Sequence, residues 1–297
     1  MPPHLGLLCA ILAYSIWGIV PIYWKQLVSV DSFEIVLHRM LWSFVFVLIY
    51  IVFVRRWHEF VALWKQPAVL GRLCVAAILN ALNWGTYIWA VNAEHIIEVS
   101  MGYFINPIIT VLFGVVLFAE RLRKMQYVAL SLVVIGIAYL VLVHGKIPYI
   151  ALVLSVSFAI YSVMKKTIQV PVVLGLGIES GLLVLPALIL LLYFHSQSTL
   201  AFGHSVSIDA LLILGGLVTL TPLLLFSAAA KSISLTTLGM SQYIGPTLQL
   251  LIGVYLYKEP FDKDWAIAFG FIWLALIIYS LDQLQHEARR GLKRINS

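Results

Sequence analysis

The chain alternates apolar runs of about 20 residues with short charged connectors along its whole length. A helix needs a run of about that length to cross the hydrocarbon core of a bilayer. Hydrophobic residues make up 62% of the sequence and charged residues only 11%, so a water-soluble fold would expose large apolar patches. Helices satisfy their own backbone hydrogen bonds in lipid. The pattern therefore predicts an all-α membrane protein whose main partner is the bilayer.

Ten runs are long and apolar enough to span. The first has no basic residue before it, and we expect it to span rather than to be removed as a signal. The expected helices lie near 5–24, 33–54, 68–91, 96–118, 126–143, 147–164, 173–194, 208–228, 235–257 and 264–283.

The distribution of basic residues predicts the orientation. With both termini on one side, that side receives 14 of the 19 Lys and Arg residues, the other side receives 4, and Arg39 lies inside a span. Lys and Arg are enriched in the cytoplasmic loops of membrane proteins. We therefore expect both termini in the cytoplasm and an even number of spans, with Lys165 and Lys166 in a cytoplasmic connector.

The two halves of the chain resemble each other. Residues 102–120 read GYFINPIITVLFGVVLFAE, and residues 241–259 read SQYIGPTLQLLIGVYLYKE, an offset of 139. Each half holds five spans, so the second must insert upside down. This predicts two inverted five-helix repeats, 1–145 and 146–285, followed by a basic cytoplasmic tail, 286–297. Such repeats expose a central site to either side of the membrane in turn.

Motifs along nearly the whole chain resemble RarD-type permeases. The first span carries AYSIWGIVP from residue 13, and the second carries HRMLWS from residue 38. Further matches are GYFINP from residue 102 and QYIGPT from residue 242. Permeases of this type belong to the EamA branch of the drug/metabolite transporter (DMT) superfamily. The resemblance implies a bacterial cytoplasmic-membrane exporter of metabolites or drugs working by alternating access. It also brings a chloramphenicol-sensitivity label, which identifies no physiological substrate.

Four ionisable residues lie inside expected spans, where a charge costs about 2.5–3.5 kcal/mol on insertion scales. Glu34 is near a membrane boundary, and we expect an interfacial, solvated carboxylate there. Arg39 lies deeper, and we expect a functional or cavity-lining role for His38 or Arg39, or else a structural pair with a neighbouring carbonyl or carboxylate. An offset of 140 places Arg39 opposite Glu179. Either the two form a structural salt bridge, or Arg39 binds a substrate carboxylate while Glu179 serves a substrate or a proton.

Polar and aromatic side chains recur at helical spacing on the other spans, which favours a cavity wall or polar packing between helices over contact with lipid. The predicted substrate-binding set is Tyr14, Trp17, His38, Arg39, Asn80, Asn83, Trp84, Tyr87, Tyr103, Asn106, Glu179, Gln242 and Tyr243.

Two prolines and two glutamates are candidate moving parts. Pro107 and Pro246 each remove a helical hydrogen bond, so they predict a packing kink or a hinge. Glu120 and Glu259 end corresponding spans, each beside a base, and are expected to be gates, loop-locking ion pairs or simple helix-end charges.

The sequence lacks a nucleotide-binding loop, a Cys/His metal spacing and a hydrolase elbow. We expect no metal, no cofactor, no enzymatic activity and, despite the net charge of +6, no nucleic-acid partner. The leading hypothesis is a secondary exporter of small polar or amphipathic molecules, with protons as a candidate coupling ion. Alternatives are an uncoupled facilitator or, less favoured, a membrane-embedded enzyme or sensor. The protein is expected to be a monomer or a homodimer.

Overall fold

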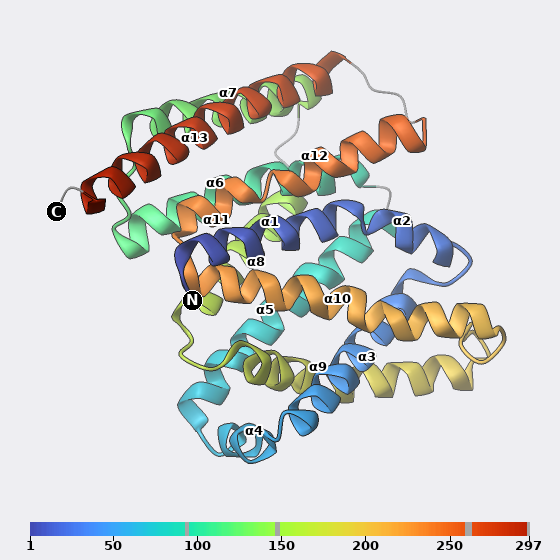
Figure 1. Cartoon of the computed structure of the whole chain (residues 1–297). Coiled ribbons are helices and arrows are strands. Elements are labelled where there is room, and N and C mark those ends of the chain that lie inside the picture. Colours follow the sequence, from blue (N-terminus) through green and yellow to red (C-terminus); the bar gives the residue numbers. More distant parts are fainter. Residues whose placement is uncertain (93–94, 146–148, 259–262, 296–297) are drawn as a thin grey trace.

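A computed structural model describes residues 1–92, 95–145, 149–258 and 263–295. These residues form helices and no strand (Figure 1), which confirms the all-α class. The α-helices are α1 Pro3–Ile19, α2 Pro21–Trp24, α3 Ser32–Phe53, α4 Trp57–Trp64, α5 Pro67–Asn92, α6 Ile96–Phe118, α7 Lys124–His144, α8 Tyr149–Thr167, α9 Val172–Ser196, α10 Val206–Ser232, α11 Leu235–Ser241, α12 Ile244–Leu251 and α13 Lys263–Ile295.

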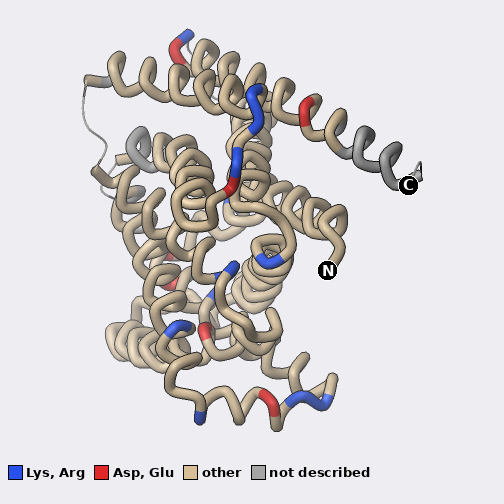
Figure 2. Tube along the Cα trace, turned by 90° about the vertical axis from the view of Figure 1, so that its left-hand side faces the viewer, with Lys and Arg blue, Asp and Glu red and all other residues tan. Residues whose placement is uncertain are grey.

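Nine helices within the described residues are long and apolar enough to cross a membrane. They correspond to nine of the ten expected spans, and α1, α2 and the 3-10 turn Lys25–Leu27 together form the first of them. Figure 2 shows that most of the helical trace carries no charge, while Lys, Arg, Asp and Glu gather mainly near helix ends and in connectors. The chain is therefore a multi-pass membrane protein.

The remaining expected span, 235–257, is not one continuous helix, which corrects the prediction. It consists of α11, α12 and a π-helical segment, Ile252–Leu256. The break falls at Gln242 and Tyr243, just before the Gly245-Pro246 step. Pro246 cannot donate a backbone hydrogen bond to the Gln242 carbonyl, so one helical hydrogen bond is missing at this step, although Gln242 and Tyr243 keep helical backbone angles.

The helix pairs that pack together follow a twofold pattern. Equivalent helices of the two halves contact each other: α3 with α9, α6 with α11, and α7 with α13. Other contacts occur in related pairs, so that α5 with α8 corresponds to α10 with α1, and α5 with α9 corresponds to α10 with α3. This arrangement is the DMT fold of two inverted five-helix repeats.

Two elements lie outside the central group of helices. Helices α7 and α13 run side by side along one edge of the molecule (Figure 1), where the Arg123 guanidinium pairs with the Asp282 carboxylate at 2.5 Å. The segment between the second and third spans, expected as a loop, forms the short helix α4. Its Phe60 is buried and packs against α9 near Gly177.

Candidate functional site

A buried ion pair joins α8 to α9. The Lys165 ammonium donates to Glu179 Oε1 at 2.7 Å, and the Tyr161 hydroxyl donates to Glu179 Oε2 at 3.1 Å. Lys165 and Glu179 are only 4% and 3% exposed. The placement of Lys165 in a connector was therefore wrong: it belongs to the last turns of α8. Phe158, Tyr161 and Lys165 recur at the spacing of one helix face, a signal that could have identified this polar surface.

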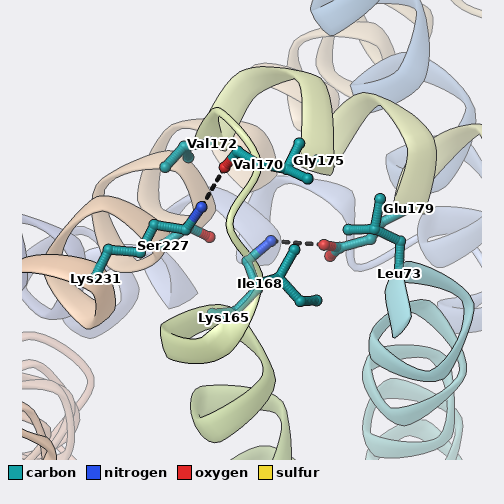
Figure 3. A pocket seen from close by; sticks show the side chains of 9 residues that line it. All are labelled: Leu73, Lys165, Ile168, Val170, Val172, Gly175, Glu179, Ser227 and Lys231. Atoms are coloured by element: carbon teal, nitrogen blue, oxygen red, sulfur yellow. Dashed lines mark hydrogen bonds and ion pairs between the residues drawn. The ribbon is translucent and has the colours of Figure 1, made fainter. Parts of the chain in front are cut away.

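Two further lysines hold the same end of the bundle together. The Lys166 ammonium on α8 donates to the carbonyl of Ile233, just after α10. In the other direction, the Lys231 ammonium on α10 donates to the Val170 carbonyl, in the link between α8 and α9 (Figure 3). Cations bind favourably to the free carbonyls at helix C-termini. These hydrogen bonds hold the ends of α8 and α10 together.

Glu179 lines two small cavities. The end cavity, shown in Figure 3, has a volume of about 10 Å³, which is room for about one water molecule. It is lined by Leu73, Lys165, Ile168, Val170, Val172, Gly175, Glu179, Ser227 and Lys231. The central cavity has a volume of about 20 Å³ and is lined by Met40, Ser43, Asn80, Trp84, Leu176, Glu179, Ser180, Leu183, Leu220 and Leu223. Of the residues that the structure describes, Glu179 is the one common to both walls.

The lining of the central cavity is mostly apolar with a few polar groups, as in small-molecule sites, while its volume is far smaller than theirs in this conformation. Its walls come from α3 and α5 of the first half and from α9 and α10 of the second. Asn80 is 6% exposed, and its Oδ1 atom accepts no hydrogen bond from the described residues. A buried acceptor without a donor is unfavourable, so this wall has a place for a hydrogen-bond donor.

Arg39 lines neither cavity, but it contacts Trp84, which lines the central one. Its Nε donates to Thr219 Oγ1 at 2.8 Å, and its guanidinium stacks 4.8 Å from the ring centres of both Trp24 and Trp84. Within the described residues it has no carboxylate partner, and the salt bridge to Glu179 that the sequence left open is not formed. Thr219 was not predicted as a site residue, although the 139-residue offset pairs it with Asn80.

Glu34 and His38 form a separate buried group. Glu34 is 1% exposed and accepts backbone hydrogen bonds from Ala201 and Phe202 at 2.9–3.0 Å. The expectation of a solvated interfacial carboxylate was therefore wrong, because the 197–205 connector folds back over it. The His38 ring stacks on Phe202 and accepts a hydrogen bond from the Trp42 indole. Neither Glu34 nor His38 lines the two cavities.

Aromatic residues of α1 pack into the core. The Tyr14 and Trp17 rings both lie within 6.5 Å of the Phe226 ring of α10, and Trp17 also meets Phe158 of α8. Tyr161 stacks on Phe226 with an interplanar angle of 8°. This aromatic cluster therefore links α1, α8 and α10 beside the carboxylate of Glu179. Tyr14 and Trp17 line neither of the two cavities.

The polar stripe of α5 divides into three kinds of contact. Asn80 and Trp84 line the central cavity. The Asn83 amide donates to the Leu154 carbonyl and the Ser157 hydroxyl of α8, so it joins two helices. Tyr87 pairs with Tyr103 of α6 at a ring distance of 6.3 Å.

Residues around the two prolines join α6 to α11. Thr110 donates to the Asn106 carbonyl and accepts from the Gln242 amide at 3.3 Å. The Tyr243 hydroxyl donates to the Phe104 carbonyl at 2.9 Å. Pro107 remains inside a continuous α6, whereas Pro246 follows the break before α12.

Glu120 connects the halves at the start of α11. Its carboxylate accepts from the backbone N–H groups of Leu235 and Thr236 at 2.7 and 2.9 Å, and from the Thr236 hydroxyl at 2.7 Å. It thus locks two loops together through backbone donors rather than through Arg121. Glu259 lies outside the described residues. Among the residues that the structure describes, no three His, Cys, Asp or Glu side chains gather as metal ligands do.

Comparison with known proteins places the chain in a family. Residues 4–142 match the model of the EamA-like transporter family. An uncharacterized transporter of Vibrio cholerae is 42% identical over 96% of both chains, and the protein RarD of Escherichia coli is 41% identical over 96% of both. A crystal structure sharing 17% identity superimposes over 93% of this chain and 97% of that one, with a TM-score of 0.71, and so supports the fold. The chain therefore belongs to the RarD-type branch of the EamA-like transporter family, and it is a membrane transporter of the DMT superfamily.

Proposed function

We propose that the chain is a secondary transporter that exports small polar or amphipathic molecules by alternating access through the central cavity. The observation that carries this proposal is the origin of the cavity walls: α3 and α5 belong to one half, and α9 and α10 belong to the other. Rocking one half against the other would change which end of the cavity is open. Residues 1–145 and 146–285 are the two moving units of this proposal.

The charges near the cavity suggest how cargo is recognised. Arg39, which has no carboxylate partner among the described residues, is the group that binds a cargo carboxylate or another acceptor. Glu179 and the Asn80 Oδ1 atom are acceptors for a cargo amine or hydroxyl. The Trp84 ring offers a flat apolar surface. These groups suit an amphipathic cargo of amino-acid-like or chloramphenicol-like character.

The remaining predicted residues take supporting roles in this proposal. Tyr87 and Tyr103 extend the aromatic wall beyond Trp84, and His38 orients Trp42 beside it. Tyr14, Trp17, Asn83, Asn106, Gln242 and Tyr243 hold the helices that rock, while Pro107 and Pro246 are the hinges and Glu120 and Glu259 the locks. The protein lies in a bacterial cytoplasmic membrane with both termini in the cytoplasm.

Uptake and efflux in proteoliposomes test this proposal. A panel of labelled amino acids and amphipathic drugs is loaded with and without a pH gradient, and Arg39→Gln is the matched variant. Transport that depends on Arg39 supports the proposal. Transport that accelerates with the gradient supports proton coupling, and transport that ignores it supports the uncoupled facilitator. Folded protein that moves no member of the panel under any gradient counts against transport of this cargo class.

A further inference from the structure

The Glu179 carboxylate belongs to the wall of both the central and the end cavity. The Lys165 ammonium occupies Oε1 of that carboxylate, and the Tyr161 hydroxyl occupies Oε2. Figure 3 shows the Lys165 and Glu179 side chains pointing toward each other across the end cavity. The ion pair therefore lies at the wall that the two cavities share.

The pair resists opening unless another cation takes the place of Lys165. Removing one partner of a buried ion pair leaves a stranded charge, which is strongly unfavourable. A group that donates hydrogen bonds and carries positive charge can replace Lys165 on Oε1 and keep the carboxylate paired. On the central side, Asn80 Oδ1 is a second acceptor and the Trp84 ring is a surface for a cation. These are the groups that bind an ammonium.

Displacement of Lys165 needs a small local rearrangement. Its side chain lines the end cavity, which has room for about one water molecule. A lysine stem has four carbons and rotates freely, so its ammonium leaves Glu179 by rotation of the stem together with widening of that cavity. Lys231 lines the same cavity and repels a second ammonium there, which favours the return of Lys165 once the competing cation has left.

We propose that Lys165 is an internal cation that closes the passage between the two cavities by occupying Glu179, and that a primary ammonium group opens it by taking the same carboxylate. Lys165 is then a specificity-determining gate, because an anion or a neutral molecule cannot exchange with it. The inference rests on the transport function proposed above, but the following tests need no transport and separate the failure of one from the failure of the other.

Chemical rescue tests the exchange directly. In the purified full-length chain, Lys165→Ala leaves the carboxylate free and makes a hole. We expect n-butylammonium to raise the thermal unfolding temperature of Lys165→Ala in a saturable way, because a ligand stabilises the state that binds it. The matched control is Lys166→Ala, which removes the neighbouring lysine without touching Glu179. The double variant Lys165→Ala with Glu179→Gln should also show no stabilisation, and n-butyrate should stabilise none of the proteins.

Cysteine accessibility tests the closure. Ser180 lines the central cavity and is absent from the end cavity, so Ser180→Cys in a background of Cys9→Ser and Cys74→Ser reports on passage. A membrane-impermeant sulfonate thiol reagent is added on the Lys165 side of oriented vesicles. We expect labelling at least about ten times faster with Lys165→Ala than with Lys166→Ala, a factor that corresponds to about 1.4 kcal/mol.

The double variant Lys165→Glu with Glu179→Lys keeps an ion pair at this position, so it should label as slowly as the parent. This double variant replaces Lys165→Ala in the test if Lys165→Ala does not fold. The proposal is overturned if n-butylammonium stabilises Lys165→Ala no more than Lys166→Ala. It is equally overturned if folded Lys165→Ala labels at the parent rate, or if the folded double variant Lys165→Glu with Glu179→Lys labels rapidly. If both tests succeed and no cargo is moved, the gate stands and the transport proposal fails.

Discussion

An offset of 140 residues pairs Arg39 on α3 with Glu179 on α9, but the two charges have different kinds of partner. Glu179 has a full counter-charge, because Lys165 lies 2.7 Å away. Arg39 is held by neutral groups, namely the hydroxyl of Thr219 and the rings of two tryptophans. Two charged side chains that the sequence offset pairs therefore have different surroundings.

This difference separates two roles that one residue cannot fill at once. A charge with an internal counter-ion is satisfied without cargo, so it suits a gate that opens only by exchange. A guanidinium held by a hydroxyl and by aromatic faces keeps N–H donors for an incoming acceptor. The comparison predicts that mutating the two residues will affect stability and transport in different proportions.

The largest effect on stability is expected from Glu179→Gln. The substitution leaves the buried Lys165 ammonium without its counter-ion, and breaking such a pair costs about 3–5 kcal/mol. Chemical denaturation in detergent micelles measures the free energy of unfolding. The double variant Glu179→Gln with Lys165→Met removes both charges and should recover most of the loss. If the single and double variants are equally unstable, the ion pair is not what stabilises this region.

A smaller loss is expected from Glu34→Gln, because its donors are neutral. Glu34 is as deeply buried as Glu179, but it accepts from the backbone N–H groups of Ala201 and Phe202. Hydrogen bonds to a charged group contribute about 1.5–3 kcal/mol, and glutamine retains one acceptor oxygen without stranding a partner charge. Denaturation under the same conditions gives the ranking. A loss equal to that of Glu179→Gln would mean that the loss of unfolding free energy depends on the burial of the carboxylate and not on a stranded cation.

Arg39→Gln should lower transport more than stability. The substitution removes one hydrogen bond from a charged group to Thr219, worth about 1.5–3 kcal/mol, and the stacking on two rings, worth about 0.5–1 kcal/mol each, and it strands no carboxylate. Parallel denaturation and efflux measurements with the proteoliposome panel check both parts. Thr219→Val is the matched control, because it removes the same hydrogen bond and keeps the cation. If transport falls equally in both variants, the effect comes from the lost hydrogen bond that positions Arg39 and not from the lost charge.

The sequence predicted the fold well because its strongest signals are local. Apolar runs, connector charges and the 139-residue offset each describe a helix or a pair of helices without requiring tertiary contacts. The broken span at Gln242 could not be read with the same certainty. Pro107 occupies the corresponding step and leaves α6 continuous, so proline alone does not decide whether a helix breaks.

The site was predicted less completely, since it depends on which side chains meet. Glu179 and Arg39 were found because charge is rare inside a span. Their partners Lys165 and Thr219 were missed, because a basic residue near a helix end resembles a connector, and a threonine is ordinary in an apolar helix. Glu34 was misplaced because its depth depends on the folding of the 197–205 connector, which no helical periodicity describes.

The smallest effect is expected at Glu59, whose ion pair with Arg56 is the exposed counterpart of the pair at Glu179. Arg56 approaches the Glu59 carboxylate to 2.6 Å, and the two side chains are 38% and 55% exposed. The hydrogen bond from Arg56 lowers the pKa of Glu59, so any contribution to stability is present above the pKa of the unfolded chain and disappears as the pH falls through the lower, folded value. Because solvent screens an exposed pair, Glu59→Gln should leave the unfolding free energy unchanged at neutral pH and add no pH dependence. Denaturation at pH 7 and pH 4 checks both points. A loss at pH 7 comparable to that of Glu179→Gln would show that an ion pair at this membrane boundary is stabilising whether or not it is buried, and the contrast between Glu179 and Arg39 would then have to rest on transport alone.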